Sequence, residues 1–236
     1  MSSATAAMLY AASTWVLPVI FAITLHEAAH GFVAHRFGDD TAWAAGRVTA
    51  NPLKHVDPFG TIVLPALLIL PSFFYGVTMP VFGYAKPVPV DFRRLDNPRR
   101  DMIWVALAGP ATNVLLAILS ALLFYGTPLM APGPSAWVAA NLVHSVEINA
   151  VLCVFNMLPL PPLDGGRVAV GILPRRLAYP LAQLERYGIG IVLILLFVLP
   201  WIGQQFHHDL DVLNWVVGVP AEALIHFVLA ITGQAG

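Results

Sequence analysis

The sequence contains several apolar stretches that are each about as long as a lipid bilayer is thick. A membrane-spanning helix needs roughly 20 mostly apolar residues. Charged residues make up only 11% of the chain, whereas a soluble domain carries about 25%. We therefore expect an α-helical polytopic membrane protein. Its predicted spans are Leu9–Ala34, Met102–Tyr125, Ala136–Leu158, Tyr187–Ile202 and Val212–Ile231.

A sixth apolar stretch, Thr61–Phe82, is long enough to cross but is broken by Pro65, Pro71 and Pro80. Proline removes a backbone donor and disrupts the interior of a helix. The stretch is therefore either a re-entrant element or a sixth span, which gives five to six transmembrane helices.

The distribution of Lys and Arg favours the re-entrant alternative. Basic clusters lie on both sides of Thr61–Phe82, and a full crossing would place one of them outside, against the positive-inside rule. A re-entrant element puts every basic residue on one face, and the loops of the other face, Gly126–Ser135 and Gly203–Asp211, carry none. We expect the N-terminus outside and the C-terminus in the cytoplasm.

The remaining segments complete the predicted organisation. Ala44–Asn51 and Tyr84–Val90 have the composition of short β or extended segments, which we expect on the cytoplasmic side because exposed backbone groups are not tolerated in lipid. The chain reads as a single domain over 1–236, with the motifs in 9–171 and two more C-terminal transmembrane helices in 172–236. A net charge of -1 argues against a nucleic-acid partner. With Cys153 as the only cysteine, no intrachain disulfide and no thiolate metal cluster are possible.

The first span contains the sequence His26-Glu27-Ala28-Ala29-His30. Positions i and i+4 share one face of a helix, so both imidazoles can reach one metal ion, and Glu27 lies beside that face, where it can take a proton from a water on the metal. An ionised side chain inside a membrane helix costs roughly 2.5–3.5 kcal/mol and is functional by default. The pattern predicts a metal site rather than a structural cluster.

A catalytic zinc ion usually has three protein ligands and a water molecule. The candidate for the third ligand is Asp164, in the segment that starts at Asn156, ends an apolar span and is broken by Pro159, Pro161 and Pro162. Taken alone, Asp164-Gly165 also fits a plain turn at the membrane interface.

Together these motifs resemble the site-2 protease family of intramembrane zinc metalloproteases, in its compact bacterial type without PDZ or CBS domains. The resemblance covers roughly Ile20–Gly171. The motifs that carry it are HExxH in the first span, Gly109-Pro-Ala-Thr-Asn113, Asn156-xx-Pro-x-Pro-x-Leu-Asp-Gly, and the segments Asn51–Gly60 and Gly83–Val90.

The resemblance implies one catalytic Zn²⁺, with Asp164 as third ligand and Glu27 as general base. Asn156 could donate a hydrogen bond to the developing oxyanion. His55 and Asp57 are candidates for orienting a ligand or water. Asn113, four residues after Gly109, is a weaker candidate of the same kind, since small-residue spacing in a membrane helix also indicates close packing.

The resemblance implies that the partner is the transmembrane segment of a membrane protein, such as an anti-sigma factor or a remnant signal peptide. Cleavage is expected within the bilayer of a bacterial cytoplasmic (inner) membrane. The active site is expected to lie towards the cytoplasmic side. A metal-ion transporter using His26, His30 and Asp164 is one alternative, and a catalytically inactive relative is another. Glu27 discriminates the protease from the transporter, because hydrolysis needs a base whereas transport does not.

Overall fold

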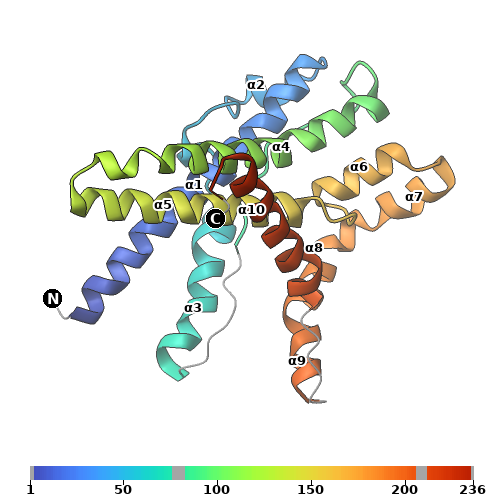
Figure 1. Cartoon of the computed structure of the whole chain (residues 1–236). Helices are drawn as coiled ribbons and strands as arrows, with labels where there is room; N and C mark the ends of the chain where they lie inside the picture. The colour runs from blue at the N-terminus through green and yellow to red at the C-terminus, as the bar shows by residue number, and fades with distance from the viewer. Residues whose placement is uncertain (1–2, 76–82, 206–211, 235–236) are drawn as a thin grey trace.

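The computed structural model describes residues 3–75, 83–205 and 212–234, and within them the chain is helical, without a β-strand (Figure 1). The α-helices are α1 Ser3–Arg36, α2 Thr41–Ala44, α3 Leu64–Tyr75, α4 Pro98–Phe124, α5 Pro132–Asn156, α6 Asp164–Ile172, α7 Arg175–Gln183, α8 Glu185–Leu193, α9 Leu199–Gln205 and α10 Val219–Ile231. Short 3₁₀ turns are η1 Pro52–Lys54 and η3 Thr127–Leu129, and π-helical turns are η2 Pro58–Val63, η4 Ile194–Val198 and η5 Asn214–Gly218.

Four helical runs in the described residues are long and apolar enough to cross a bilayer: Thr5–Arg36, Pro98–Leu129, Pro132–Asn156 and Asn214–Ile231. They carry four of the five predicted spans, and the chain is an integral membrane protein. The fifth, Tyr187–Ile202, lies in the helical run of α8, η4 and α9, which is not among the four. Large side chains on the outer faces of these helices are exposed, as Leu115 is at 66%, which suits contact with lipid.

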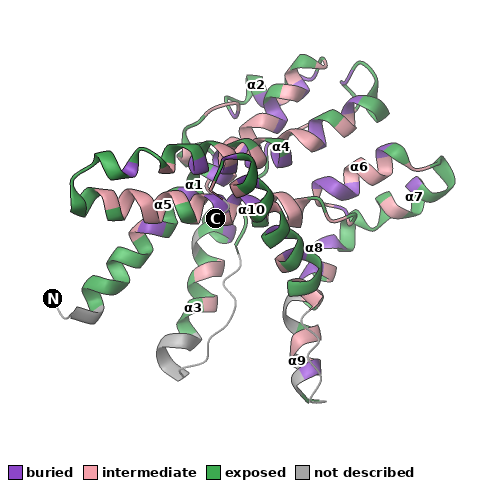
Figure 2. Cartoon of the chain, viewed as in Figure 1, coloured by how far each residue is buried: buried purple, intermediate pink, exposed green. Residues whose placement is uncertain are grey.

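The core lies where α1, α4 and α5 pack together, and Figure 2 shows the buried residues gathered at that crossing. Small side chains let the helices approach closely. One buried cluster joins α4, α5 and α10 through Ala117, Ala121, Val146 and Val228. At the crossing of α1 with α4, His26 and His30 of the first span contact residues of α4.

The predicted re-entrant stretch begins and ends at one place. Asp57 caps η2, its carboxylate accepting from the backbone N–H groups of Phe59 and Gly60 at 3.0 and 2.7 Å. After α3 the chain returns to the same point, where the Tyr84 N–H donates to the Gly60 carbonyl at 3.0 Å. The last part of the stretch, residues 76–82, lies outside the described residues. The Gly60–Tyr84 contact supports the re-entrant alternative over a sixth span.

The segments predicted as β or extended are present as irregular chain rather than strands. Pro87 and Pro89 have no N–H to donate to a ladder. The Lys86 N–H is bonded to the His55 carbonyl at 2.9 Å, and the Lys86 carbonyl accepts from Arg47 at 2.7 Å. With its backbone groups used in these separate contacts, the segment cannot pair as a strand.

The end of α10 is tied to the end of α4. The Tyr125 hydroxyl donates to the Thr232 carbonyl at 2.8 Å. The loop that follows Tyr125 was predicted to lie outside, so this contact is inconsistent with the predicted cytoplasmic C-terminus. The reason is the orientation of α10, whose packing against α4 the charge distribution could not reveal.

Candidate metal centre

His26 and His30 lie one turn apart on α1, which continues as one helix from the preceding apolar run through both residues. Their Nε2 atoms are 3.1 Å apart, and both residues are buried among the helices. The spacing therefore does what the sequence predicted: it turns both imidazoles towards one point.

Asp164 comes to the same point from α6, of which it is the first residue. Its Oδ2 lies 3.2 Å from His26 Nε2 and 3.3 Å from His30 Nε2. The turn before α6 is tight: a Cβ on Gly165 would lie 2.1 Å from the Met157 carbonyl oxygen. A glycine after Asp164 lets the chain fold back closely enough to deliver the carboxylate to α1.

The other nitrogen of each imidazole is bonded to α4. His26 Nδ1 lies 2.6 Å from Asn113 Oδ1, and His30 Nδ1 lies 2.6 Å from the Val105 carbonyl oxygen. Both partners accept, so each Nδ1 donates, and each Nε2 faces the point where the three residues converge. Such outer partners are the usual means of orienting a metal-binding histidine.

The arrangement fits a cation. The two Nε2 atoms and one carboxylate oxygen converge at 3.1–3.3 Å, and the buried Asp164 Oδ2 has no hydrogen-bond partner within the described residues. Tetrahedral zinc with bonds of about 2.0–2.1 Å places its ligands roughly 3.3–3.4 Å apart. The three residues form a group that could hold a metal ion, and nitrogen with carboxylate oxygen is a donor set that zinc accepts.

The electrostatics of Asp164 point the same way. Burial alone would raise the pKa of the Asp164 carboxyl, but the adjacent His30 and His26 side chains hold that pKa well below its usual range. Asp164 is therefore a carboxylate at neutral pH, as a ligand must be.

Gly109 leaves the space in front of the two imidazoles open. A Cβ at Gly109 would lie 2.5 Å from His26 Nε2 and 2.5 Å from His30 Nε2. Gly109 and Asn113 are thus parts of the site. The sequence had favoured a packing seam for this pair, and their four-residue spacing is the signal that both face α1.

Glu27 is held by the irregular segment between α3 and α4. Its Oε2 accepts from the Val88 N–H at 2.7 Å. The same segment packs on α1 one residue beyond the motif, where a Cβ on Gly31 would lie 3.0 Å from Val88 Cγ1. The structure thus brings the predicted extended segment against the predicted base.

Three other candidate residues have different partners. Asn156 donates to the Leu152 carbonyl on its own helix at 3.0 Å. Buried His55 is bonded through Nε2 to the Thr49 carbonyl at 3.1 Å, and Asp57 caps η2. The three-residue group does not include them.

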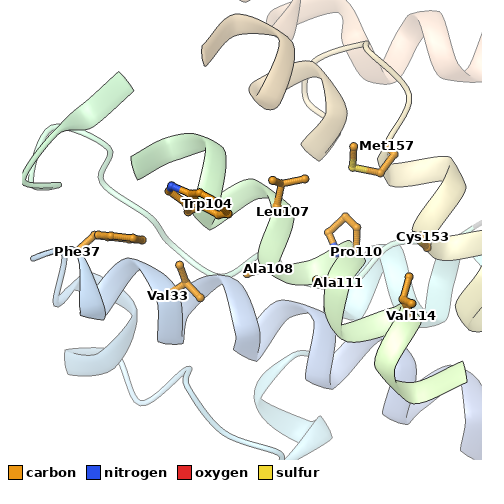
Figure 3. Close-up of a pocket in the computed structure, with 10 residues that line it drawn as sticks. All are labelled: Val33, Phe37, Trp104, Leu107, Ala108, Pro110, Ala111, Val114, Cys153 and Met157. Carbon is orange, nitrogen blue, oxygen red and sulfur yellow. The ribbon is translucent and has the colours of Figure 1, made fainter. Parts of the chain in front are cut away.

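An apolar pocket of about 610 Å³ lies along α4, with further lining residues at the ends of α1 and α5 (Figure 3). It is lined by Val33, Phe37, Trp104, Leu107, Ala108, Pro110, Ala111, Val114, Cys153 and Met157. None of the three ligand candidates, His26, His30 and Asp164, lines this pocket, so the pocket is separate from the candidate metal site.

The relatives found by comparison with known proteins are named as zinc metalloproteases. The chain is 39% identical over 190 residues to "Putative zinc metalloprotease YwhC" of Bacillus subtilis, covering 78% of this chain and 80% of the relative. It is 32% identical over 188 residues to "Putative zinc metalloprotease Rip2" of Mycolicibacterium smegmatis, covering 79% and 67%. "Putative zinc metalloprotease MJ0611" of Methanocaldococcus jannaschii is 31% identical over 147 residues, covering 61% and 62%. No family model and no solved structure matches the chain.

Proposed function

Because this chain belongs to the site-2 protease family of zinc metalloproteases, we propose that it is an intramembrane endopeptidase that cuts transmembrane segments of other membrane proteins. The observation that carries the proposal is the convergence of Asp164, from α6, with His26 and His30, which lie next to Glu27 on a helix long enough to span a bilayer. A buried site of this composition inside lipid suits a substrate that is itself embedded in lipid.

The chemistry follows from the residues around the centre. When bound, zinc supplies Lewis-acid polarisation of a carbonyl and lowers the pKa of a nearby water molecule. Glu27 takes the proton from that water and passes it to the leaving amine. An amide carries two N–H donors, so Asn156 can keep its bond to Leu152 and still donate to the oxyanion.

The substrate segment must unwind before it is cut, because a helical peptide group is shielded by its own hydrogen bonds. The chain Tyr84–Val90 lies against Glu27, so an unwound substrate segment that reaches the base passes beside this segment. The exposed basic residues Lys54 and Lys86 lie near the ends of the re-entrant stretch, which supports a cytoplasmic position for this face. A single-pass signalling protein, such as an anti-sigma factor, or a remnant signal peptide is the substrate class we propose.

Replacement of the base tests this function. In the Glu27→Gln variant we expect cleavage to slow by at least about 100-fold, the lower end of what a general base contributes, while zinc content stays at the wild-type level. The measurement compares fragments of membrane proteins, by proteomics, in cells carrying either form, with zinc analysis of both purified chains.

Two matched variants serve as references. Glu222→Gln makes the same change at an exposed position of α10 and should cleave as wild type does. Asp164→Ala should lose both zinc and cleavage. Cleavage by Glu27→Gln at the wild-type rate would reject the scheme, and zinc transport that survives in Glu27→Gln would favour a transporter instead.

A further inference from the structure

We propose that Asn149, a residue of α5 rather than of the helices that carry the ligands, is a positioning residue for the metal centre. It acts through Asn113, whose side-chain orientation it fixes, and so determines which nitrogen of His26 carries the proton. The inference rests on the proposed zinc site and adds to it a residue that lies outside both metal-binding motifs.

A buried chain of hydrogen bonds connects α5 to α1. Asn149 Nδ2 donates to the Ser145 carbonyl at 2.8 Å, and Asn113 Nδ2 donates to Asn149 Oδ1 at 2.8 Å. His26 Nδ1 then donates to Asn113 Oδ1 at 2.6 Å. Asn149 and Asn113 are 1% and 0% exposed, so no water competes for these groups.

The direction of the chain is set at its far end. A backbone carbonyl can only accept, so the Asn149 atom that faces Ser145 O is the amide nitrogen. This leaves Asn149 Oδ1 towards α4, where it can only accept, and Asn113 must present its own nitrogen there. Reversing either amide would set two like groups against each other in a dry interior, where unsatisfied polar groups are costly.

The consequence reaches the metal centre. With its nitrogen engaged by Asn149, Asn113 turns its oxygen to His26, and Nδ1 of that imidazole is the protonated nitrogen. Asn113 Nδ2 also faces the Ala22 carbonyl, but at 3.5 Å, which is too long for a strong bond. Without Asn149, Asn113 is free to turn over, and the proton of His26 can then occupy the nitrogen that zinc needs.

The test is the zinc affinity of the full chain in detergent, measured by competition with a chromophoric chelator. We expect Asn149→Leu to weaken zinc binding by about 10-fold or more, the range measured for outer partners of metal ligands. Asn141→Leu is the matched control, because Asn141 lies on the same helix and also donates to the carbonyl four residues earlier, that of Trp137. It should bind zinc as wild type does.

A double variant separates positioning from general destabilisation. Once Asn113→Leu has removed the intermediate residue, adding Asn149→Leu should weaken zinc binding no further, whereas independent effects would multiply. Asn149→Ala removes the same acceptor with a smaller change and replaces Asn149→Leu if the latter does not fold.

Three results would overturn the inference. Wild-type zinc affinity in both Asn149→Leu and Asn149→Ala would reject the positioning role of Asn149 and leave the metal centre standing. Multiplicative effects in the double variant would reject the same role. Equal zinc binding by wild type and Asp164→Ala would instead reject the proposed metal centre itself, and with it the proposed function.

Discussion

At the scale of single residues, Glu27 is notable because a backbone group holds it. The bond from the Val88 N–H to Glu27 Oε2 fixes where the base lies relative to the two histidines. A hydrogen bond to a charged group contributes roughly 1.5–3 kcal/mol, enough to matter for the geometry of proton transfer.

Removal of that N–H gives a prediction. Val88→Pro should lower kcat by about 10-fold, the equivalent of roughly 1.4 kcal/mol of lost orientation, and leave zinc content unchanged. Proline suits this site because the flanking residues are already Pro87 and Pro89. Val88→Ala keeps the N–H and loses most of the side chain, so equal activity losses in the two variants would show that packing, and not the bond, is what matters.

Sequence reasoning at this scale worked where one helix carries the pattern. The spacing of His26 and His30 predicted their convergence because helical geometry is local. Asp164 was a candidate from the sequence, but a plain turn fitted it as well until the family resemblance implied the ligand role, since only the tight turn before α6 brings it to α1. Asn113 was only a weak candidate beside the packing alternative, because its direct contact with His26 depends on how α4 crosses α1.

At the scale of elements, α8 supports the turn that delivers Asp164. A Cβ on Gly188 would lie 2.0 Å from the Pro161 carbonyl oxygen and 2.2 Å from Pro162 Cδ. These prolines precede the ligand by two and three residues. The position of the third ligand therefore depends on a helix that contributes nothing to the site.

Two glycines of α8 allow a clean comparison. Gly188→Ala should displace the turn and weaken zinc binding by at least about 10-fold, as disturbed ligand support commonly does. Gly190→Ala, two residues on, meets nothing within 4 Å and should bind zinc normally, with a stability gain of about 0.5–1 kcal/mol for alanine in a helix. Chelator competition and thermal unfolding of both variants measure this, and normal zinc binding by Gly188→Ala would contradict the proposed support.

Element prediction succeeded for the long apolar helices and failed for the short ones. Length and hydropathy identify α1, α4, α5 and α10, because lipid demands both. The helices α6 and α7 were not predicted, since nine residues each are too few for a span. The segments expected as β or extended form no ladder within the described residues; in Tyr84–Val90, prolines and other contacts use backbone groups that a ladder requires.

At the scale of the whole molecule, the bond between Gly60 and Tyr84 brings together the two chain segments that flank the α3 region. Charge asymmetry favoured this arrangement from sequence alone. The contact between Tyr125 and Thr232 could not be anticipated, because apolar helices of similar composition give no signal for which of them pack together.

Site-directed labelling tests this topology. In a Cys153→Ser background, which removes the only cysteine, single cysteines replace Lys54, Lys86 or Ala131, all exposed. A membrane-impermeant maleimide should label Lys54→Cys and Lys86→Cys from the same face and Ala131→Cys from the opposite one. Labelling of Lys86→Cys together with Ala131→Cys would mean that residues 61–82 cross the membrane fully.

The ligands of the proposed centre come from two places far apart in the chain, the first long helix and the first residue of α6. A metal ion there would act as a cross-link, closing a loop that contains α3, α4 and α5, much as a disulfide would in a secreted protein. Chelation of the metal would then release α6 from α1 and leave the packing of α1, α4 and α5 intact. Metal supply would thus govern the assembly of the enzyme as well as its chemistry.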